Sequence, residues 1–156
     1  MNVKFYRLRV NAKLPVRAHR TDAGMDLFYC PNGNRGASML DNGDYWLSAR
    51  SSNLVSTGLK TEIPEGYMLE IKNKSGIASK RGLLVGACVV DRGYTGEIFV
   101  NLHNVTHRNQ TLHDGDKIAQ AVFVKVTTEV DLVESEDIYD KETSRGEGAL
   151  GSTGDR

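Results

Sequence analysis

Short apolar segments alternate with turn signals along most of this sequence. The clearest is 117–126 (KIAQAVFVKV), and Ala87–Val90 and Ile98–Leu102 are two more runs rich in apolar and β-branched residues. Turn residues recur roughly every 8–12 residues, and no long segment has the 3.6-residue period of an amphipathic helix. A chain with this pattern can bury its apolar side chains only on strands. The sequence therefore predicts an all-β fold, either a sandwich or a jelly roll.

Further strands are predicted at Val3–Val10, Ala23–Cys30 and Leu54–Ile63. The last is expected to pair with Tyr67–Lys72 across the turn 64–66 (PEG), because Pro suits the first turn position and Gly the position two residues later. Ala87–Val90 and Ile98–Leu102 are expected to pair as a second hairpin. Asn73–Leu84 is the most basic stretch, and its composition favours a short solvated helix or turn.

The length of 156 residues suits one domain. Residues 1–144 are predicted to form it. Arg145–Arg156 contains four glycines and little that could pack, so 145–156 is predicted to be a mobile C-terminal arm. The Gly- and Asn-rich segment Pro31–Asp44 is predicted to be a surface loop.

Composition excludes several classes of partner. Lys plus Arg and Asp plus Glu both number 20, so no overall basic field attracts nucleic acid. A polyanionic ligand would need locally placed cations. No run approaches the ~20 apolar residues that span a bilayer, so no membrane partner is expected. Cys30 and Cys88 are predicted to be free, buried thiols, which indicates a reducing compartment. The protein is therefore expected in the cytoplasm, or in the host-cell cytoplasm if the source is viral.

A few polar residues are placed where chemistry is plausible. Asp91 and Tyr94 lie at the tip of the second predicted hairpin, where they suit ligand binding as well as an ordinary Asx-turn. Asp26 lies among apolar neighbours, as either a turn cap or the partner of a cation or water. Gln120 lies in mid-strand, as either a satisfied core amide or a ligand contact. The Lys-Ser-Gly at 74–76 could offer N–H groups to a phosphate.

Five segments resemble, in order, the five motifs of the trimeric dUTP diphosphatases (dUTPases): AGMDL, NKSGIA, GACVVDRGYTGEI, GDKIAQ and RGEGALGSTG. The resemblance extends from Ala23 to Gly154. It implies a β jelly roll assembled as a homotrimer with shared active sites, in which the tail of one subunit closes a site built by others. The implied reaction is Mg²⁺-dependent hydrolysis of dUTP to dUMP and pyrophosphate by water attack on the α-phosphate, which limits uracil in DNA and supplies dUMP for dTMP synthesis.

The resemblance also implies a role for each matching residue. Asp91 would orient and activate the attacking water, and Tyr94 would pack under the deoxyribose. Asp26 would contact Mg²⁺ through water, while the substrate phosphates hold the ion. Phosphate contacts are implied for Lys74, Ser75, Gly76, Gln120, Arg145, Ser152 and Thr153. The backbone of the arm that includes Ala87, Cys88 and Val90 would read the uracil edge. In the tail, Leu150 would cover the ring, and Gly151 is implied as a further substrate contact.

The chain departs from the family pattern at four positions. Lys74 stands where Arg is usual, which leaves a point charge in place of a bidentate fork. Leu150 replaces the Phe that stacks on uracil, Ala149 replaces a Gly beside it, and Cys88 replaces a small residue, often Gly.

Two alternatives follow from the same residues. A dCTP deaminase is similar in fold and nucleotide class, and it would need a glutamate base, for which Glu97 is the nearest candidate. A nucleotide-sensing binder would instead use the Pro31–Asp44 loop as a partner surface.

Overall fold

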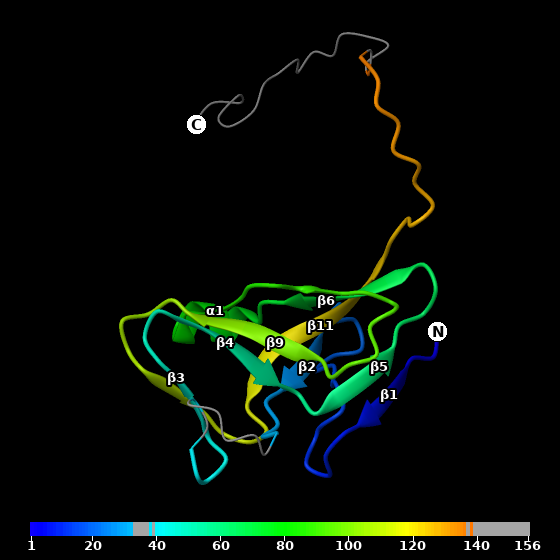
Figure 1. The fold of residues 1–156 in the computed structure, drawn as a ribbon. Coiled ribbons are helices and arrows are strands. Elements are labelled where there is room, and N and C mark those ends of the chain that lie inside the picture. The colour runs from blue at the N-terminus through cyan, green and yellow to red at the C-terminus, as the bar shows by residue number, and fades with distance from the viewer. Residues whose placement is uncertain (33–37, 39, 137, 139–156) are drawn as a thin grey trace.

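The structure is a computed structural model that describes residues 1–32, 38, 40–136 and 138. In this part of the chain, antiparallel strands form two principal sheets (Figure 1). The first has the order β2 (Met25–Phe28), β11 (Lys117–Lys125), β6 (Tyr67–Lys72), β8 (Val89–Val90). The second has the order β4 (Ser51–Ser56), β9 (Phe99–Asn104), β7 (Leu83–Val85). Two smaller pairs join β1 (Lys4–Arg7) to β5 (Leu59–Glu62), and β3 (Tyr45–Leu47) to β10 (Gln110–Leu112).

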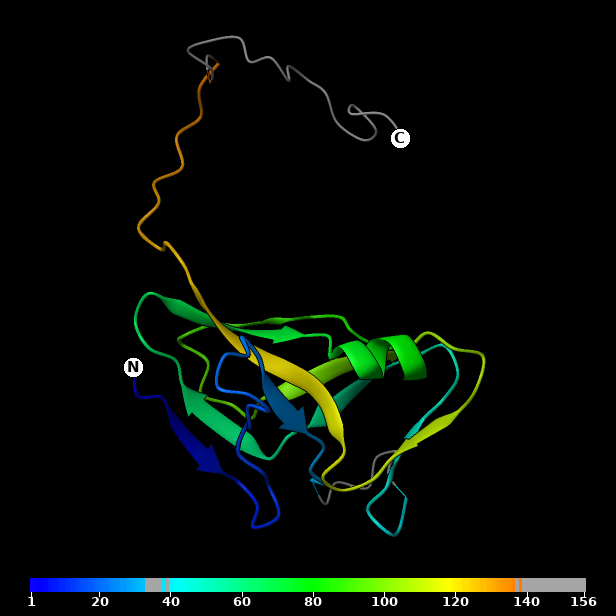
Figure 2. The ribbon, with the colours of Figure 1, turned by 180° about the vertical axis from the view of Figure 1, so that it is seen from behind.

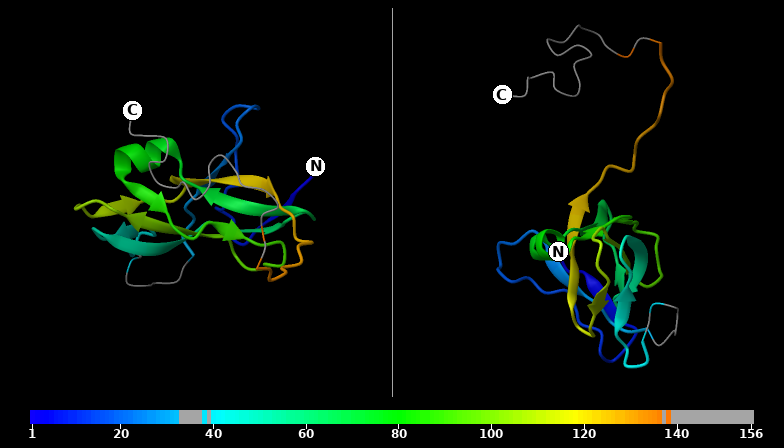
Figure 3. Two further views of the ribbon diagram at one scale, coloured as in Figure 1. Left: turned by 90° about the horizontal axis from the view of Figure 1, so that it is seen from above. Right: turned by 90° about the vertical axis from the view of Figure 1, so that its left-hand side faces the viewer.

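One hydrophobic core lies between the layers. In both views of Figure 3, β11 (yellow) and β4 (teal) lie on opposite sides of the body. Side chains from both principal sheets belong to the same buried cluster, among them Leu69, Ile71, Val55, Val100 and Leu102. The cluster, the strand content and the near absence of helix confirm the predicted all-β fold.

Alternation along β9 follows the prediction. Ile98, Val100 and Leu102 are buried, whereas Phe99, Asn101 and His103 are partly exposed on the other face. Because successive side chains of a strand point to opposite faces, a single strand both closes the core and lines an outer surface.

Leu54–Ile63 is not a single strand, and its predicted pairing is wrong. β4 ends at Ser56, and Gly58 has a φ of +72°, a left-handed conformation that breaks the strand before β5. β5 pairs with β1, whereas β6 pairs with β11 and β8. The turn itself is present, since the Tyr67 N–H donates to the Pro64 carbonyl at 3.2 Å.

The second predicted hairpin is also wrong in its pairing. β9 pairs with β7 as far as Val85 opposite Leu102, whereas β8 pairs with β6, with Val90 opposite Leu69. The chain therefore leaves one sheet after Val85 and joins the other by Val89. The two arms splay apart, and this opens space between β8 and β9.

The predicted short helix is confirmed as α1 (Ser75–Arg81), which packs at one end of the body (Figure 2). Gly82 ends it in a left-handed conformation (φ 58°), and its N–H donates to the Ala78 carbonyl at 3.1 Å. Lys80 and Arg81 occupy the last turn, where positive charge complements the helix dipole.

Both cysteines are free, as predicted. Cys30 is buried, but Cys88 is only partly buried, because it lies where the chain crosses between sheets rather than inside a strand. No helix among the described residues is long and apolar enough to cross a membrane.

After β11 the chain leaves the body. Residues 127–136 extend away from both sheets (Figure 1, orange). Leu132 and Val133 in this segment are 94% and 83% exposed, which is unusual for two neighbouring apolar side chains.

Candidate active site

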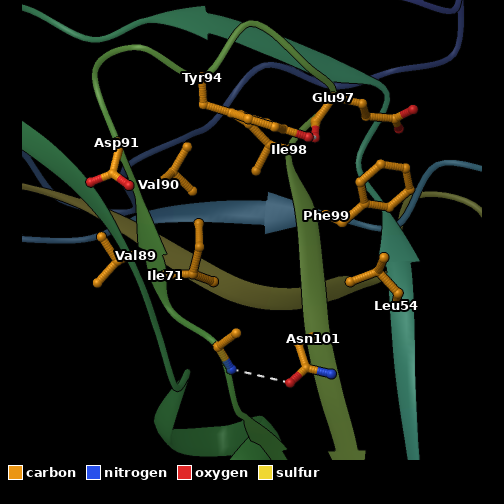
Figure 4. A pocket seen from close by; sticks show the side chains of 11 residues that line it. Leu54, Ile71, Val89, Val90, Asp91, Tyr94, Glu97, Ile98, Phe99 and Asn101 are labelled. Atoms are coloured by element: carbon orange, nitrogen blue, oxygen red, sulfur yellow. Dashed lines mark hydrogen bonds between the residues drawn. The ribbon is translucent and has the colours of Figure 1, made fainter.

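The splayed arms of β8 and β9 enclose a cavity of about 260 Å³ (Figure 4). Its inner walls are apolar, and Ile71, Ile98 and Phe99 contribute to them. Four of the residues predicted for a site line it: Ala87, Val90, Asp91 and Tyr94. We call this cavity the hairpin pocket.

Asp91 and Tyr94 lie at the rim of the hairpin pocket. The Tyr94 N–H donates to the main-chain carbonyl of Asp91 at 3.0 Å, so the turn is closed by backbone rather than by the Asp91 side chain. Within the described part of the chain, the exposed Asp91 carboxylate forms no hydrogen bond or ion pair. The carboxylate is therefore available to a ligand or a water.

Tyr94 is fixed by its own turn. Its hydroxyl donates to the Glu97 carbonyl at 2.8 Å, and its ring lies against Gly96. A Cβ at position 96 would lie 2.4 Å from the Tyr94 hydroxyl oxygen and 2.5 Å from the ring carbon that bears it. Gly96 thus permits the ring to lie over the turn, where it forms one wall of the pocket.

Glu97 also borders the hairpin pocket, but its carboxylate is already paired. It accepts hydrogen bonds from the Arg9 guanidinium and from the Gly58 N–H, the latter at 2.7 Å, and its side chain is 13% exposed. A carboxylate held this way is poorly placed to act as the general base that a deaminase needs.

A second, more polar cavity of about 580 Å³ lies on the β2–β11–β6 sheet. Asp26, Lys74 and Gln120, all predicted from the sequence, line it, together with Gly24 and Asn73. In the sheet, Gln120 lies opposite Asp26 on one side and Lys72 on the other. We call this cavity the lysine pocket.

Asp26 is clamped by two ammonium groups. Its Oδ1 lies 2.6 Å from Lys74 Nζ and its Oδ2 lies 2.7 Å from Lys117 Nζ, while its side chain is 8% exposed. Burial raises the pKa of the Asp26 carboxyl, but hydrogen bonds from Lys117 and Lys74 outweigh this and lower the pKa below its ordinary value. Asp26 is therefore ionised at neutral pH, and the pair of lysines leaves the cluster with a surplus positive charge.

Gln120 is both satisfied and exposed to the cavity. Its Nε2 donates to the Asn73 carbonyl at 2.9 Å. A Cβ at Gly24 would lie 2.0 Å from its Oε1, so only glycine leaves room for the amide in this position. The side chain is held by its surroundings and still lines the pocket.

The predicted residues thus fall into two groups. Among the described residues of one copy, none lines both the hairpin pocket and the lysine pocket. Ser75 and Gly76 begin α1 directly after Lys74. The Cys88 carbonyl accepts the Ile71 N–H at 2.7 Å, and Cys88 does not line the hairpin pocket. Arg145, Leu150, Gly151, Ser152 and Thr153 lie outside the described residues.

Sequence reasoning missed Lys117, Asn73, Gly24 and Asn101 as parts of these pockets. Lys117 reaches Asp26 only through the pairing of β11 with β2, in which the register shifts between Lys117 and Ala119. That shift has no local signal in the sequence. Gly24 and Asn73 lie beside predicted residues, and their roles depend on packing alone.

The described residues contain no cluster of three or more metal-ligating His, Cys, Asp or Glu side chains. They therefore provide no all-protein metal cage. Mg²⁺ does not need one, because it keeps several waters and is usually held by one or two carboxylates together with ligand phosphates. Asp22 and Asp26 both line the lysine pocket, and this donor set suits a hydrated ion carried by a phosphate ligand.

Comparison with known proteins shows which family this chain resembles. The sequence pattern of the dUTPase family matches residues 10–154. The deoxyuridine 5'-triphosphate nucleotidohydrolase of Kluyveromyces lactis is 33% identical over 144 residues, which cover 92% of this chain and 88% of the relative.

Solved structures show the same fold. A Staphylococcus bacteriophage 80alpha dUTPase variant, solved with dUpNHpp, superposes with a TM-score of 0.81 at 25% identity and covers 98% of each chain. A dUTPase variant from phage phi11 of S. aureus, described with a structural Mg(II) ion, has a TM-score of 0.73 at 24% identity over 88% of this chain and 98% of that one.

Proposed function

The chain belongs to the dUTPase family and hydrolyses dUTP to dUMP and pyrophosphate, and we propose that the hairpin pocket and the lysine pocket are the two parts of its active site. The observation that carries this proposal is the unpaired Asp91 carboxylate beside a fixed Tyr94 at the rim of the hairpin pocket. The remaining assignments rest on it.

Asp91 is the catalytic residue of this proposal. Its carboxylate accepts a hydrogen bond from a water, aims it at the α-phosphorus and takes its proton as the new P–O bond forms. The bond from the α-phosphorus to the bridging oxygen breaks, and pyrophosphate leaves. A carboxylate is a weak base at neutral pH, so orientation of the water contributes more than basicity.

Tyr94 and the arm before it select the nucleotide. The ring of Tyr94 lies under the deoxyribose, where a 2′-hydroxyl would meet its face. The backbone around Ala87, Cys88 and Val90 reads the base edge, which rejects cytosine because its mismatched polar groups would stay unpaired. The apolar walls of the hairpin pocket suit the faces of a pyrimidine ring.

Phosphate binding belongs to the lysine pocket. Lys74, the first turn of α1 at Ser75 and Gly76, and Gln120 contact the phosphates in this proposal. Lys74 then exchanges Asp26 for a phosphate, while Lys117 keeps its pair with Asp26. Mg²⁺, when bound, neutralises the negative charge that the triphosphate carries. Asp26, with one oxygen released, would hold it through water.

In this proposal neither pocket is sufficient alone, and no described residue of one copy lines both pockets. We therefore infer a homotrimer in which the hairpin pocket of one subunit faces the lysine pocket of another. The exposed Leu132 and Val133 on the segment that leaves the body support this, because contact with a second copy would cover them.

Residues 1–144 act as one domain, and 145–156 as an arm that brings Arg145, Leu150, Gly151, Ser152 and Thr153 onto the nucleotide.

A panel of nucleotides tests this function. The purified protein with Mg²⁺ is incubated with dUTP, UTP, dCTP and dTTP, and pyrophosphate and ammonia are both measured. We expect pyrophosphate from dUTP, little from the other three and no ammonia. Ammonia from dCTP would make the chain a deaminase, and tight dUTP binding without turnover would favour a nucleotide-sensing role.

A further inference from the structure

The chain changes sheets at residues 86–88, a segment that we call the fork. On one side of it, the Gly86 N–H still donates to the Asn101 carbonyl of β9 at 2.8 Å. On the other, the Cys88 carbonyl already accepts the Ile71 N–H of β6 at 2.7 Å. The backbone ladder between the arm and β9 therefore stops at Gly86, and the hairpin pocket begins where it stops.

One side chain replaces the missing ladder bond. Asn101 Oδ1 accepts the Ala87 N–H at 3.1 Å, the contact drawn as a dashed line in Figure 4. Both Ala87 and Asn101 line the hairpin pocket. The carboxamide thus joins the two walls of the pocket at its inner end, opposite the rim that carries Asp91.

The orientation of this carboxamide is set by its other partners. Its Nδ2 donates to Ser52 Oγ at 3.0 Å and to the Asn53 carbonyl at 3.4 Å, both on β4. His103 Nε2 lies 3.0 Å from Oδ1, on the same side as the Ala87 N–H. A flipped amide would place its NH₂ against the Ala87 donor, so the network admits only this orientation.

The fork is packed against the same carboxamide. A Cβ at position 86 would lie 2.2 Å from Asn101 Oδ1 and 2.2 Å from His103 Nε2. A side chain at position 86 would have to displace the Asn101 carboxamide and the His103 ring, so Gly86 permits this close approach. The arm is held at one distance from β9 by this close packing and by the Asn101 hydrogen bond together.

We propose that Asn101 is a positioning residue for base selection: its carboxamide holds the Ala87 N–H and so fixes the width of the hairpin pocket. The inference deepens the proposed function and rests on it. A backbone that discriminates between bases must keep its N–H and C=O groups at fixed positions, because a mobile arm would adapt to the wrong base. Asn101 acts on the arm and not on the reacting atoms.

Three variants separate this role from a structural one. Asn101→Ala removes the acceptor, and Asn101→Asp keeps an oxygen for the Ala87 N–H while removing the amide donor. Asn109→Ala is the matched control, because the Asn109 Oδ1 accepts the Ala49 N–H at 2.9 Å in a loop that borders neither pocket. Each is assayed with dUTP and dCTP, and amide hydrogen exchange at Ala87 is followed by NMR.

We expect Asn101→Ala to raise KM for dUTP about tenfold, with kcat within about twofold, because only binding of the base is loosened. The preference for dUTP over dCTP in kcat/KM should fall about tenfold, and protection of the Ala87 amide should be lost. Asn101→Asp should retain the protection and most of the preference. Asn109→Ala should match the wild type in its preference for dUTP and in the protection of the Ala87 amide.

An Asn101→Ala variant that keeps its preference and its Ala87 protection would overturn the inference. So would equal losses in Asn101→Ala and Asn109→Ala. If Asn101→Asp loses the preference but keeps the protection, the amide donor contacts the base directly, and the positioning role is wrong. Failure of the proposed function looks different, because the wild type itself would then not hydrolyse dUTP.

Discussion

The proposed chemistry depends on Asp91 more than on any other residue. Its carboxylate is unpaired among the described residues, in contrast to Asp26 and Glu97, which are clamped by cations. A free carboxylate at a pocket rim has no structural task that its removal would disturb. Its proposed task is to orient water, so its loss should lower turnover and leave nucleotide binding largely unchanged.

Asp91→Asn is therefore expected to keep nucleotide affinity within about threefold while lowering kcat by about 10²–10⁴-fold. The amide is isosteric but cannot take the proton of the water. Steady-state turnover, together with binding of a non-hydrolysable dUTP analogue by calorimetry, measures both quantities. Wild-type turnover in this variant would remove Asp91 from the role.

Gly96 and Gly93 form a matched pair on the same turn. A Cβ at Gly96 would collide with the Tyr94 ring, whereas a Cβ at Gly93 would meet nothing within 4 Å. We expect Gly96→Ala to displace Tyr94 and to lower the preference for dUTP over UTP about tenfold, because the wall under the sugar moves. Gly93→Ala should retain the preference. Equal behaviour of the two variants in competitive assays would show that Tyr94 does not read the sugar.

At the scale of elements, β2 and β11 are joined by the Asp26 clamp as well as by their ladder. The ionised carboxylate is stabilised in the folded state, so the pKa of Asp26 is lower there than its ordinary value of 3.8. A lowered folded-state pKa means that the stabilisation is complete above the ordinary pKa and is lost as the pH falls through the lowered value.

Asp26→Asn is therefore expected to lower the free energy of unfolding by about 1–3 kcal/mol at pH 7. The difference from the wild type should shrink steadily below about pH 4, as the wild-type carboxyl is protonated. Urea unfolding at a series of pH values measures this difference, with Glu65→Gln as control because the Glu65 side chain is 86% exposed. A difference that stays constant down to pH 2 would mean that the charge of Asp26 contributes nothing.

Local pattern was enough to predict the faces of β9, the short α1 and the all-β class, because alternation and turn chemistry act over a few residues. Strand partners were predicted wrongly, because the sequence favours pairing between neighbouring segments. β4 pairs with β9 and β6 with β11, which are far away in the chain, and the change of sheet between Val85 and Val89 carries no marked signal. The places of Lys117 and Asn101 in the pockets depend on which strands pair, and so they could not be predicted. Asp91 and Tyr94 could be predicted, because they belong to a recognisable motif.

At the scale of the whole molecule, one copy holds two separate cavities, which we propose are two parts of one site. Asp91 and Lys74 line separate cavities, and the described residues that line one cavity do not line the other. We propose that a complete site takes the hairpin pocket from one subunit and the lysine pocket from another. If the site is shared, a mixed trimer can combine the intact hairpin pocket of one variant with the intact lysine pocket of another, and the fraction of such sites can be calculated.

Co-refolding of two inactive variants measures it directly. Asp91→Asn damages only the hairpin pocket and Lys74→Ala only the lysine pocket, and each is also refolded alone as a control. In an equal mixture, random assembly gives about a quarter of the sites two intact pockets, so dUTP hydrolysis should recover to about a quarter of the wild-type rate. A mixture that hydrolyses dUTP no faster than the average of its two components would contradict a site shared between subunits.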